Sequence, residues 1–563
     1  MSSKLRSRAL RLLEAWKGLQ VSYYGGKYSV HRLLALEAFS HGASLIVCVQ
    51  IPLPMIILVF VPESVPLQDP KEGWRANYGF WIRVVILTFV ITHFSTGQAI
   101  YFIDNLTIST RRLVLLSSAV SIIFTLCVIP IGANLIFPLP FSILALTPIY
   151  MYNILHIVIF RVIMGGRVVQ LLRERREQLV KYMNFLYAQI LMMFIYPIYE
   201  VLFRYAEGSR YQLLVIVLLP IIKVLIKNVV LRRTTHVEDI TPEAVIFTVD
   251  FFNAIYVATC MQSASSVFAV LAITVTDLSQ TLIMLYGLHG RTVDIRSRVP
   301  HCDTSASLLS SLAIVCRNPE KFRKQSQARL RIRSCFPHQV SSLDARLLDT
   351  LSCIDQPVDS TVVVPFRKKS SVLSLDKALT PTPRKFWCMY IRRSNLVHPN
   401  QDTKELVNVA IAEENQTNEK ENSRVNPPEN YPTMLIDSFE VLFTMECLVV
   451  TAYLEAVIPF FYTAYILAMM HQMNGVTSEN VGSTVLPVFV FGLLQVMSFW
   501  MLVAVVKRNC GMQALYHLAF VLEAQRSMIQ GKLIIWMVIT LCFRVVHFGV
   551  DFTFQFSGLD YRF

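Results

Sequence analysis

Residues 439–470 read FEVLFTMECLVVTAYLEAVIPFFYTAYILAMM, and this stretch decides the fold of the chain. The run exceeds the roughly 20 apolar residues that a helix needs to cross a bilayer. It therefore predicts a membrane helix that tilts or breaks, with Pro459 as the natural point. The run also carries Glu446 and Glu455. Ionisable residues within a bilayer are costly and usually face a partner or water, so the stretch indicates one helix of a larger bundle.

Ten further apolar stretches recur along the 563 residues. Charged residues make up only 16% of the chain and the mean hydropathy is +0.49, whereas soluble proteins carry about 25% charged residues. These values exclude a soluble single core, and the long continuous runs favour helices over a barrel. We predict an all-α, polytopic transmembrane bundle of about eleven helices: 42–62, 79–101, 113–136, 139–163, 183–203, 211–231, 243–261, 265–289, 439–470, 484–506 and 533–555.

The distribution of Lys and Arg predicts how this bundle is oriented. Cytoplasmic loops of membrane proteins carry an excess of these residues, and long loops do not count. With the N-terminus cytoplasmic and the C-terminus outside, the short inner segments carry 20 Lys and Arg and the outer loops 5. This asymmetry accounts for the net charge of +14 without a nucleic-acid partner. The predicted organisation is a basic amphipathic N-terminus (1–41), helices one to eight (42–289), a cytoplasmic insert (290–438), helices nine to eleven (439–555) and an outer tail (556–563).

The insert of residues 290–438 is basic at its start and otherwise polar. Residues 305–315 and 341–352 have a weak helical pattern, and residues from about 355 to 430 are predicted to be mostly disordered. The basic run is either a contact for anionic inner-leaflet lipids or a topology signal. The remainder is either a binding segment for a cytosolic protein or a solvated linker. The candidate lipid-contact residues are Arg317, Lys321, Arg323, Lys324, Arg329, Arg331 and Arg333.

Ionisable residues within the apolar stretches form a candidate intramembrane site. Arg544, His547 and Asp551 are spaced one helical turn apart, so they would share a face of the last helix. Glu455 and Arg544 would either form a buried pair that fixes helix packing or belong to a conduction or coupling site. Asp250 and Asp277 lie on consecutive helices, at depths that differ by roughly 7 Å. They would either approach each other and serve proton or cation coupling, or each bond to nearby hydroxyl groups. Lys227 and Arg83 lie near predicted helix ends, where they can reach the interface. The candidate residues are Asp250, Asp277, Glu446, Glu455, Arg544, His547 and Asp551.

Motifs for enzyme chemistry are absent from the sequence. There is no GxxxxGK[ST] phosphate loop, no HExxH, no GxSxG and no CxxC pair. We therefore expect no metal and no cofactor, and an enzyme is the weaker class, resting only on intramembrane acids and histidines.

Two phrases carry a resemblance to other proteins: VDFFNAIYVATCMQ at 249–262 and MECLVVTAYLEAVIP at 445–459. They resemble stretches of a group of multi-pass membrane proteins from oomycetes that has no assigned biochemistry. The resemblance implies a polytopic membrane layout and carries over no catalytic or binding residue. The positions on which it rests are Cys447, Glu455, Ile458, Pro459 and Tyr462.

Two functions fit these observations. The many prolines within apolar stretches and the central acids favour a transporter or a channel-like protein for an ion or small solute. The long cytoplasmic insert favours instead a membrane-embedded signalling or scaffolding protein.

Overall fold

The structure of the protein is a computed structural model. It describes residues 28–39, 44–66, 68, 72–134, 137, 149–206, 208–209, 211–234, 245–264, 267–298, 308–318, 331–334, 340–354, 431–472, 478–542, 546–547 and 550–551. The chain forms two compact units, Met1–Asp355 with Pro432–Phe563, and Gln356–Tyr431. Apart from Tyr431, all described residues belong to the first unit. The segment from about 355 to 430, predicted to be disordered, lies outside the described residues.

The longest helix of the described chain is α19 (Tyr431–Gln472), which continues through Pro459 as one helix, so of the two predicted alternatives, a tilt or a break, the break does not occur. Most of its side chains are buried. Helices α14 and α20 differ, because their outer sides expose large apolar residues. Side chains of α19 contact segments that are far apart in the sequence, including α2, α3, α11, η4, α13, α20 and α21. This helix is therefore the centre of the bundle.

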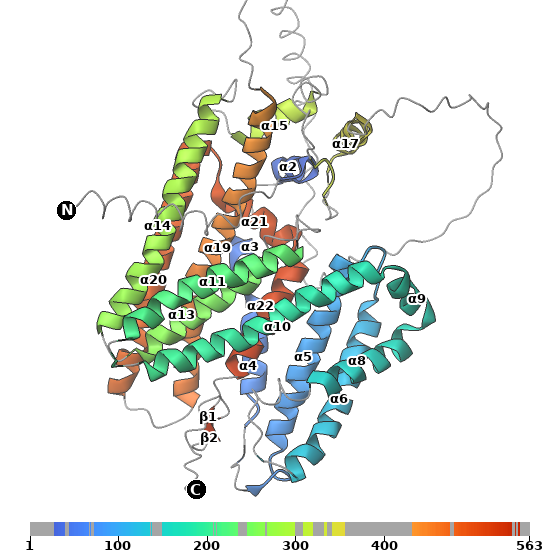
Figure 1. Cartoon of the computed structure of the whole chain (residues 1–563), viewed down its shortest axis with the longest axis vertical. Coiled ribbons are helices and arrows are strands. Elements are labelled where there is room, and N and C mark those ends of the chain that lie inside the picture. The colour runs from blue at the N-terminus through green and yellow to red at the C-terminus, as the bar shows by residue number, and fades with distance from the viewer. Residues whose placement is uncertain are drawn as a thin grey trace, which may run out of the picture. The chain divides into compact units, whose positions relative to one another are not determined.

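Long helices of the bundle lie beside α19, among them α11, α13, α14 and α20 (Figure 1). Helix α14 packs on α20, and α10 packs on α11. Side-chain pairs show that α14 and α20 run in the same direction, because Asp277 meets Gln495 and Thr292 meets Asn509 further along both helices. The elements are α10 (Arg176–Tyr205), α11 (Gln212–Thr234), η4 (Ile246–Asp250), α13 (Phe251–Ser263), α14 (Val267–Arg298) and α20 (Ser478–Cys510).

A second group of helices packs beside α10 and α22. Helix α5 packs on α6, and α6 packs on α8. Helix α9 is bent by 118° from α8, next to Gly165, which has a positive φ of 80°. The elements of this group and its connections are α3 (Ser44–Gln50), α4 (Leu53–Glu63), α5 (Tyr78–Phe102), α6 (Thr110–Asn134), α8 (Ile149–Met164), α9 (Gly166–Glu174), α21 (Ala514–Ala524) and α22 (Arg526–Cys542).

Three short helices pack together at one end of α19. Helix α2 (Val30–Glu37) comes from the N-terminal segment, and α15 (Leu308–Arg317) and α17 (Ser342–Ile354) come from the start of the predicted insert. Both α15 and α17 contact α2. The weak helical patterns at 305–315 and 341–352 thus correspond to real helices, and this part of the insert belongs to the same compact unit as the bundle.

Seven helices of the described chain are long and apolar enough to span a membrane, or eight if α8 and α9 form one bent span. These helices identify the chain as a membrane protein. The predicted count of eleven differs because three of its stretches form shorter helices. Prolines 52 and 54 interrupt 42–62, and the π-helical turn interrupts 243–261. In the third stretch, 533–555, the helix ends early.

The last predicted helix is wrong beyond Cys542, where α22 ends. His547 and Asp551 lie instead on two short antiparallel strands, β1 (Val546–His547) and β2 (Val550–Asp551). The local sequence is rich in β-branched and aromatic residues and contains Gly549, all of which disfavour a helix. The helical face predicted for Arg544, His547 and Asp551 is therefore not formed, and Arg544 itself lies outside the described residues.

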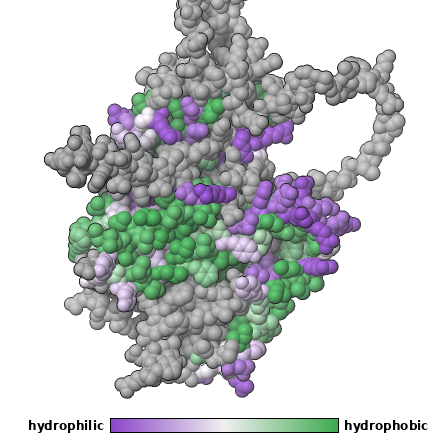
Figure 2. Space-filling view, viewed as in Figure 1, coloured by the Kyte–Doolittle hydropathy of each residue, from purple (hydrophilic) through white to green (hydrophobic). Residues whose placement is uncertain are grey.

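Among the residues coloured in Figure 2, hydrophobic side chains form a broad area over the middle of the molecule, and hydrophilic side chains gather where α9 lies. On α14 the exposed apolar side chains follow one side of the helix. A continuous apolar face of this kind suits contact with lipid. The residues on α14 are Val267, Phe268, Leu271, Val275, Leu282 and Tyr286.

Gly531 of α22 tests the packing of α22 on α5. A Cβ atom at this position would lie 2.7 Å from Cδ1 of Phe94, which is closer than real contacts allow. We expect Gly531→Ala to lower the melting temperature in detergent, because overpacking costs about 1–3 kcal/mol and outweighs the gain in helix propensity. Gly290→Ala on α14 is the matched control, since nothing lies within 4 Å of its Cβ position, and it should not lower the melting temperature. Equal effects of the two substitutions would contradict the close approach.

Candidate functional site

Five charged side chains gather within the bundle, and we call them the central charge cluster: Lys223, Lys227, Asp250, Asp277 and Glu455. Each has 8% or less of its surface exposed. They come from α11, η4, α14 and α19, which are separated by up to 232 residues in the sequence. Charges buried among apolar helices are costly unless they are paired, so their convergence is the main feature of the site.

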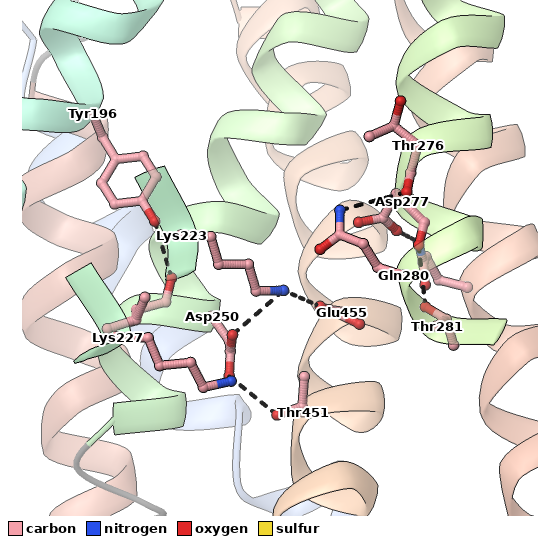
Figure 3. A network of polar contacts seen from close by, with 12 residues as sticks. Tyr196, Lys223, Lys227, Asp250, Thr276, Asp277, Gln280, Thr281, Thr451 and Glu455 are labelled. Carbon is pink, nitrogen blue, oxygen red and sulfur yellow. Dashed lines mark hydrogen bonds and ion pairs between the residues drawn. The ribbon is translucent and has the colours of Figure 1, made fainter. Parts of the chain in front are cut away.

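Lys223 lies between two carboxylates (Figure 3). Its Nζ is 2.8 Å from Glu455 Oε1 and 3.4 Å from Asp250 Oδ1. One lysine thereby joins α11 to both α19 and the π-helical turn. Removal of Lys223 would take a cation from both carboxylates, and of the two only Asp250 keeps a second lysine, Lys227, within 4 Å in the described part of the chain.

Asp250 is the last residue of η4, and it is fully buried. Its Oδ2 accepts a hydrogen bond of 3.1 Å from the Thr451 hydroxyl and lies 3.7 Å from Lys227 Nζ. The turn is irregular, because Phe247 has a ψ of 15° instead of a helical value. Irregular backbone at membrane depth is tolerated where it is enclosed in protein or lines a cavity, and π-helical turns are frequent at functional sites.

Asp277 lies at the α14–α20 contact and has a neutral hydrogen-bond partner. The Gln495 side-chain amide donates to its Oδ2. Asp277 also interacts electrostatically with Lys223 and Glu455. Asp277 is therefore linked to the cluster by electrostatic interaction with Lys223 and Glu455, and the described residues show no ion pair that it forms.

A third buried lysine, Lys532 of α22, lies beside the π-helical turn. Its Nζ donates to Thr248 Oγ1 at 3.2 Å and stands 4.9 Å from the centre of the Phe185 ring, a cation–π contact. The turn thus has a lysine on either side, Lys532 at Thr248 and Lys227 at Asp250.

Local sequence explains how these side chains meet. Lys223 and Lys227 are four residues apart on α11, so they share one helical face. Glu455 precedes Pro459 by four residues, and proline has no N–H to donate to the Glu455 carbonyl. The irregular turn at 246–250 places Asp250 opposite Thr451, within the buried face of α19.

Glu446 lies in a second buried group that does not include the other predicted acids. Arg32 of α2 is 2.7 Å from Glu446 Oε1, and both side chains have 1% of their surface exposed. His517 Nε2 of α21 is 3.0 Å from Glu446 Oε2, and Tyr28 Oη is 3.4 Å from the same nitrogen. This Glu446 group joins the N-terminal segment and α21 to α19.

Helix α2 is also joined to the start of the predicted insert. Arg317 of α15 is 2.9 Å from Glu37 Oε2 and 3.4 Å from Asp344 Oδ1. Burial raises the pKa of Glu37, and Arg317 opposes this shift. Beside it, Cys316 is fully buried, and burial raises the pKa of its thiol to about 12. These contacts make α2, α15 and α17 one packed layer.

The structure changes several sequence-based assignments. Glu455 pairs with Lys223 of α11, whereas Arg544, its predicted partner, lies outside the described residues. Lys227 does not reach the interface but is buried beside Asp250, and Arg83 donates to the Val65 carbonyl. Asp250 and Asp277 are on opposite sides of the Lys223–Glu455 pair in Figure 3 instead of forming a pair.

Sequence reasoning missed the partners of the acids. Lys223 and Lys227 carried a usable signal, because two cations four residues apart on an apolar helix require carboxylates on a neighbouring helix. Gln495, Arg32 and His517 carried none, because each contact depends on the tertiary arrangement of distant segments.

The candidate lipid-contact residues are only partly described. Arg317 pairs with Glu37 and Asp344, and Arg333 pairs with Asp349, so protein carboxylates occupy both guanidinium groups. The Arg331 carbonyl accepts a hydrogen bond from Val30 N. Lys321, Arg323, Lys324 and Arg329 lie outside the described residues.

Comparison of the chain with protein-family models, curated proteins and solved structures yields no match. The geometry of the site therefore carries the functional argument alone. Within the described ranges, no three His, Cys, Asp or Glu side chains stand close enough together to hold a metal ion.

The Arg32–Glu446 pair gives a stability prediction. Arg32→Met should destabilise the protein by about 3–5 kcal/mol, because it leaves a buried carboxylate without its cation. Arg32→Met combined with Glu446→Leu should cost less than Arg32→Met alone. Thermal unfolding in detergent measures both. Arg333→Met is the control, since its pair with Asp349 is mostly exposed, and it should cost less than about 1 kcal/mol. An additive double variant would contradict the pairing.

Cys316 reports on the packing of α15 against α2. At pH 7–8 its buried thiol, with a raised pKa, should react slowly with a maleimide, as measured by mass spectrometry. Arg317→Ala should accelerate the reaction several-fold, because the lost ion pairs weaken the packing by about 1 kcal/mol. Arg346→Ala, at an exposed position of α17, should leave the rate unchanged. The packing would be refuted if both variants behaved alike.

Proposed function

We propose that the protein is a multi-pass membrane transporter for an ion or small solute, and that the central charge cluster is its translocation site. The observation that carries this proposal is the burial of two lysines and three carboxylates on four elements at an irregular π-helical turn. Broken or irregular helices at the centre of a bundle are where transporters bind their substrates. In the same proposal the N-terminus is cytoplasmic, and the chain belongs to the oomycete group that it resembles.

A purely structural role explains this arrangement less well. Apolar residues of similar volume often stabilise a core as much as a buried ion pair does, so packing alone does not call for a cluster of five charged side chains. Here Lys223 is shared by two carboxylates, and Asp277 has an amide as its hydrogen-bond partner. Because one ammonium group is shared by several carboxylates, it can exchange one carboxylate partner for another. A transport cycle requires such an exchange, whereas a fixed core does not.

A second candidate function is signalling or scaffolding through the predicted insert. One observation favours it: α15 and α17, at the start of the insert, pack on α2, and α2 contacts α19 through Arg32. A cytosolic protein bound to the insert would thereby be linked to the bundle.

The test of transport uses the full chain in proteoliposomes under imposed gradients of K⁺, Na⁺, Cl⁻ and H⁺. We expect flux of at least one ion in the wild type. Glu455→Gln should reduce it by about tenfold or more, because Lys223 loses one of its two carboxylates. Glu440→Gln is the matched control on the same helix: it is half-buried near the start of α19, and it should retain flux.

Folding is checked separately from flux, by melting temperature and size-exclusion profile. The absence of any flux from well-folded wild type refutes transport. Flux that Glu455→Gln leaves at the wild-type level would place the translocation site elsewhere.

A further inference from the structure

We propose that Asp277 binds and releases the proton that drives transport through the central charge cluster. This inference rests on the proposed function, which names a site but no coupling ion. It assigns the ion, a proton, and the residue that carries it.

The first argument is the distribution of charge. Lys223 is shared between Asp250 and Glu455, and Lys227 also lies beside Asp250. Lys532 is on the Thr248 side of the turn. The lysines therefore gather around Asp250 and Glu455, and among the residues that the structure describes Asp277 is the acid of the cluster without an ion pair. A buried carboxylate in this position is stabilised by holding a proton.

The second argument is the geometry at Asp277. Gln495 donates its amide hydrogen to Oδ2, which leaves Oδ1 as the oxygen that takes the proton. The charged groups that face Asp277 are Lys223 from α11 and Glu455 from α19, and α20 presents the neutral Gln495. A proton on Oδ1 removes the repulsion between Asp277 and Glu455 without displacing Lys223.

Release of the proton changes the balance around Lys223. The O–H bond at Oδ1 breaks, its electron pair remains on the carboxylate, and the proton leaves as the coupling ion. The new negative charge then competes with Glu455 and Asp250 for the Lys223 ammonium group. Because these groups lie on α14, α19, η4 and α11, the proton state of one carboxylate biases the packing of four elements.

Infrared difference spectroscopy measures the proton directly, without any assay of transport. The carbonyl band of a protonated carboxylic acid should disappear as the pH of the purified full chain is raised. Asp277→Asn should abolish this transition. Gln495→Leu should shift it to higher pH, because the carboxylate loses its hydrogen-bond donor. Glu440→Gln should leave the transition unchanged.

Proton flux into proteoliposomes, followed with a trapped pH-sensitive dye, is the second measurement. Asp277→Asn should abolish proton flux, and Glu440→Gln should not. A band that depends on Asp277 without flux of any ion would support the proton site and refute transport. A transition that persists in Asp277→Asn, or flux of Na⁺ or K⁺ that is independent of pH, would overturn the proton assignment and leave the transport proposal standing.

Discussion

The cost of burying charge in a bundle of apolar helices governs this structure, and Lys223 offsets part of this cost by pairing with two carboxylates. Its ammonium group lies within 3.4 Å of carboxylates on two different elements. Breaking a buried pair by removal of one partner costs about 3–5 kcal/mol, so α11, α19 and the π-helical turn are held in one arrangement as long as Lys223 is charged. Apolar contacts alone do not specify such an arrangement, because lipid is as apolar as the helices.

Two buried acids on α19 pair with different parts of the structure, so two distinct groups of buried charges lie along one helix. Glu455 pairs within the set of long helices, whereas Glu446 pairs with Arg32 and His517 from short segments. The same helix therefore holds both the proposed translocation site and the layer formed by α2, α15 and α17. A protein that bound this layer would act on α19 at the Glu446 group.

The sequence alone predicted the class of fold and most of the long helices, because a run of about 20 apolar residues has few alternatives. It also identified Asp250, Asp277, Glu446 and Glu455 as residues needing explanation. It failed where two local patterns compete: the apolar stretch beyond Cys542 contains strand-forming residues that hydropathy does not distinguish from helix formers. The partners of the acids were out of reach, since Glu455 and Lys223 are 232 residues apart.

The unbroken course of α19 through Pro459 has a mechanical consequence. Glu446 and Glu455 are nine residues apart, which is roughly 13 Å along a helix that is stiff in its axial direction. A displacement of one carboxylate along the helix axis therefore moves the other carboxylate by nearly the same distance. Arg32 and Lys223 pair with these two carboxylates, so the rigid stretch of α19 between them couples the positions of the two basic side chains.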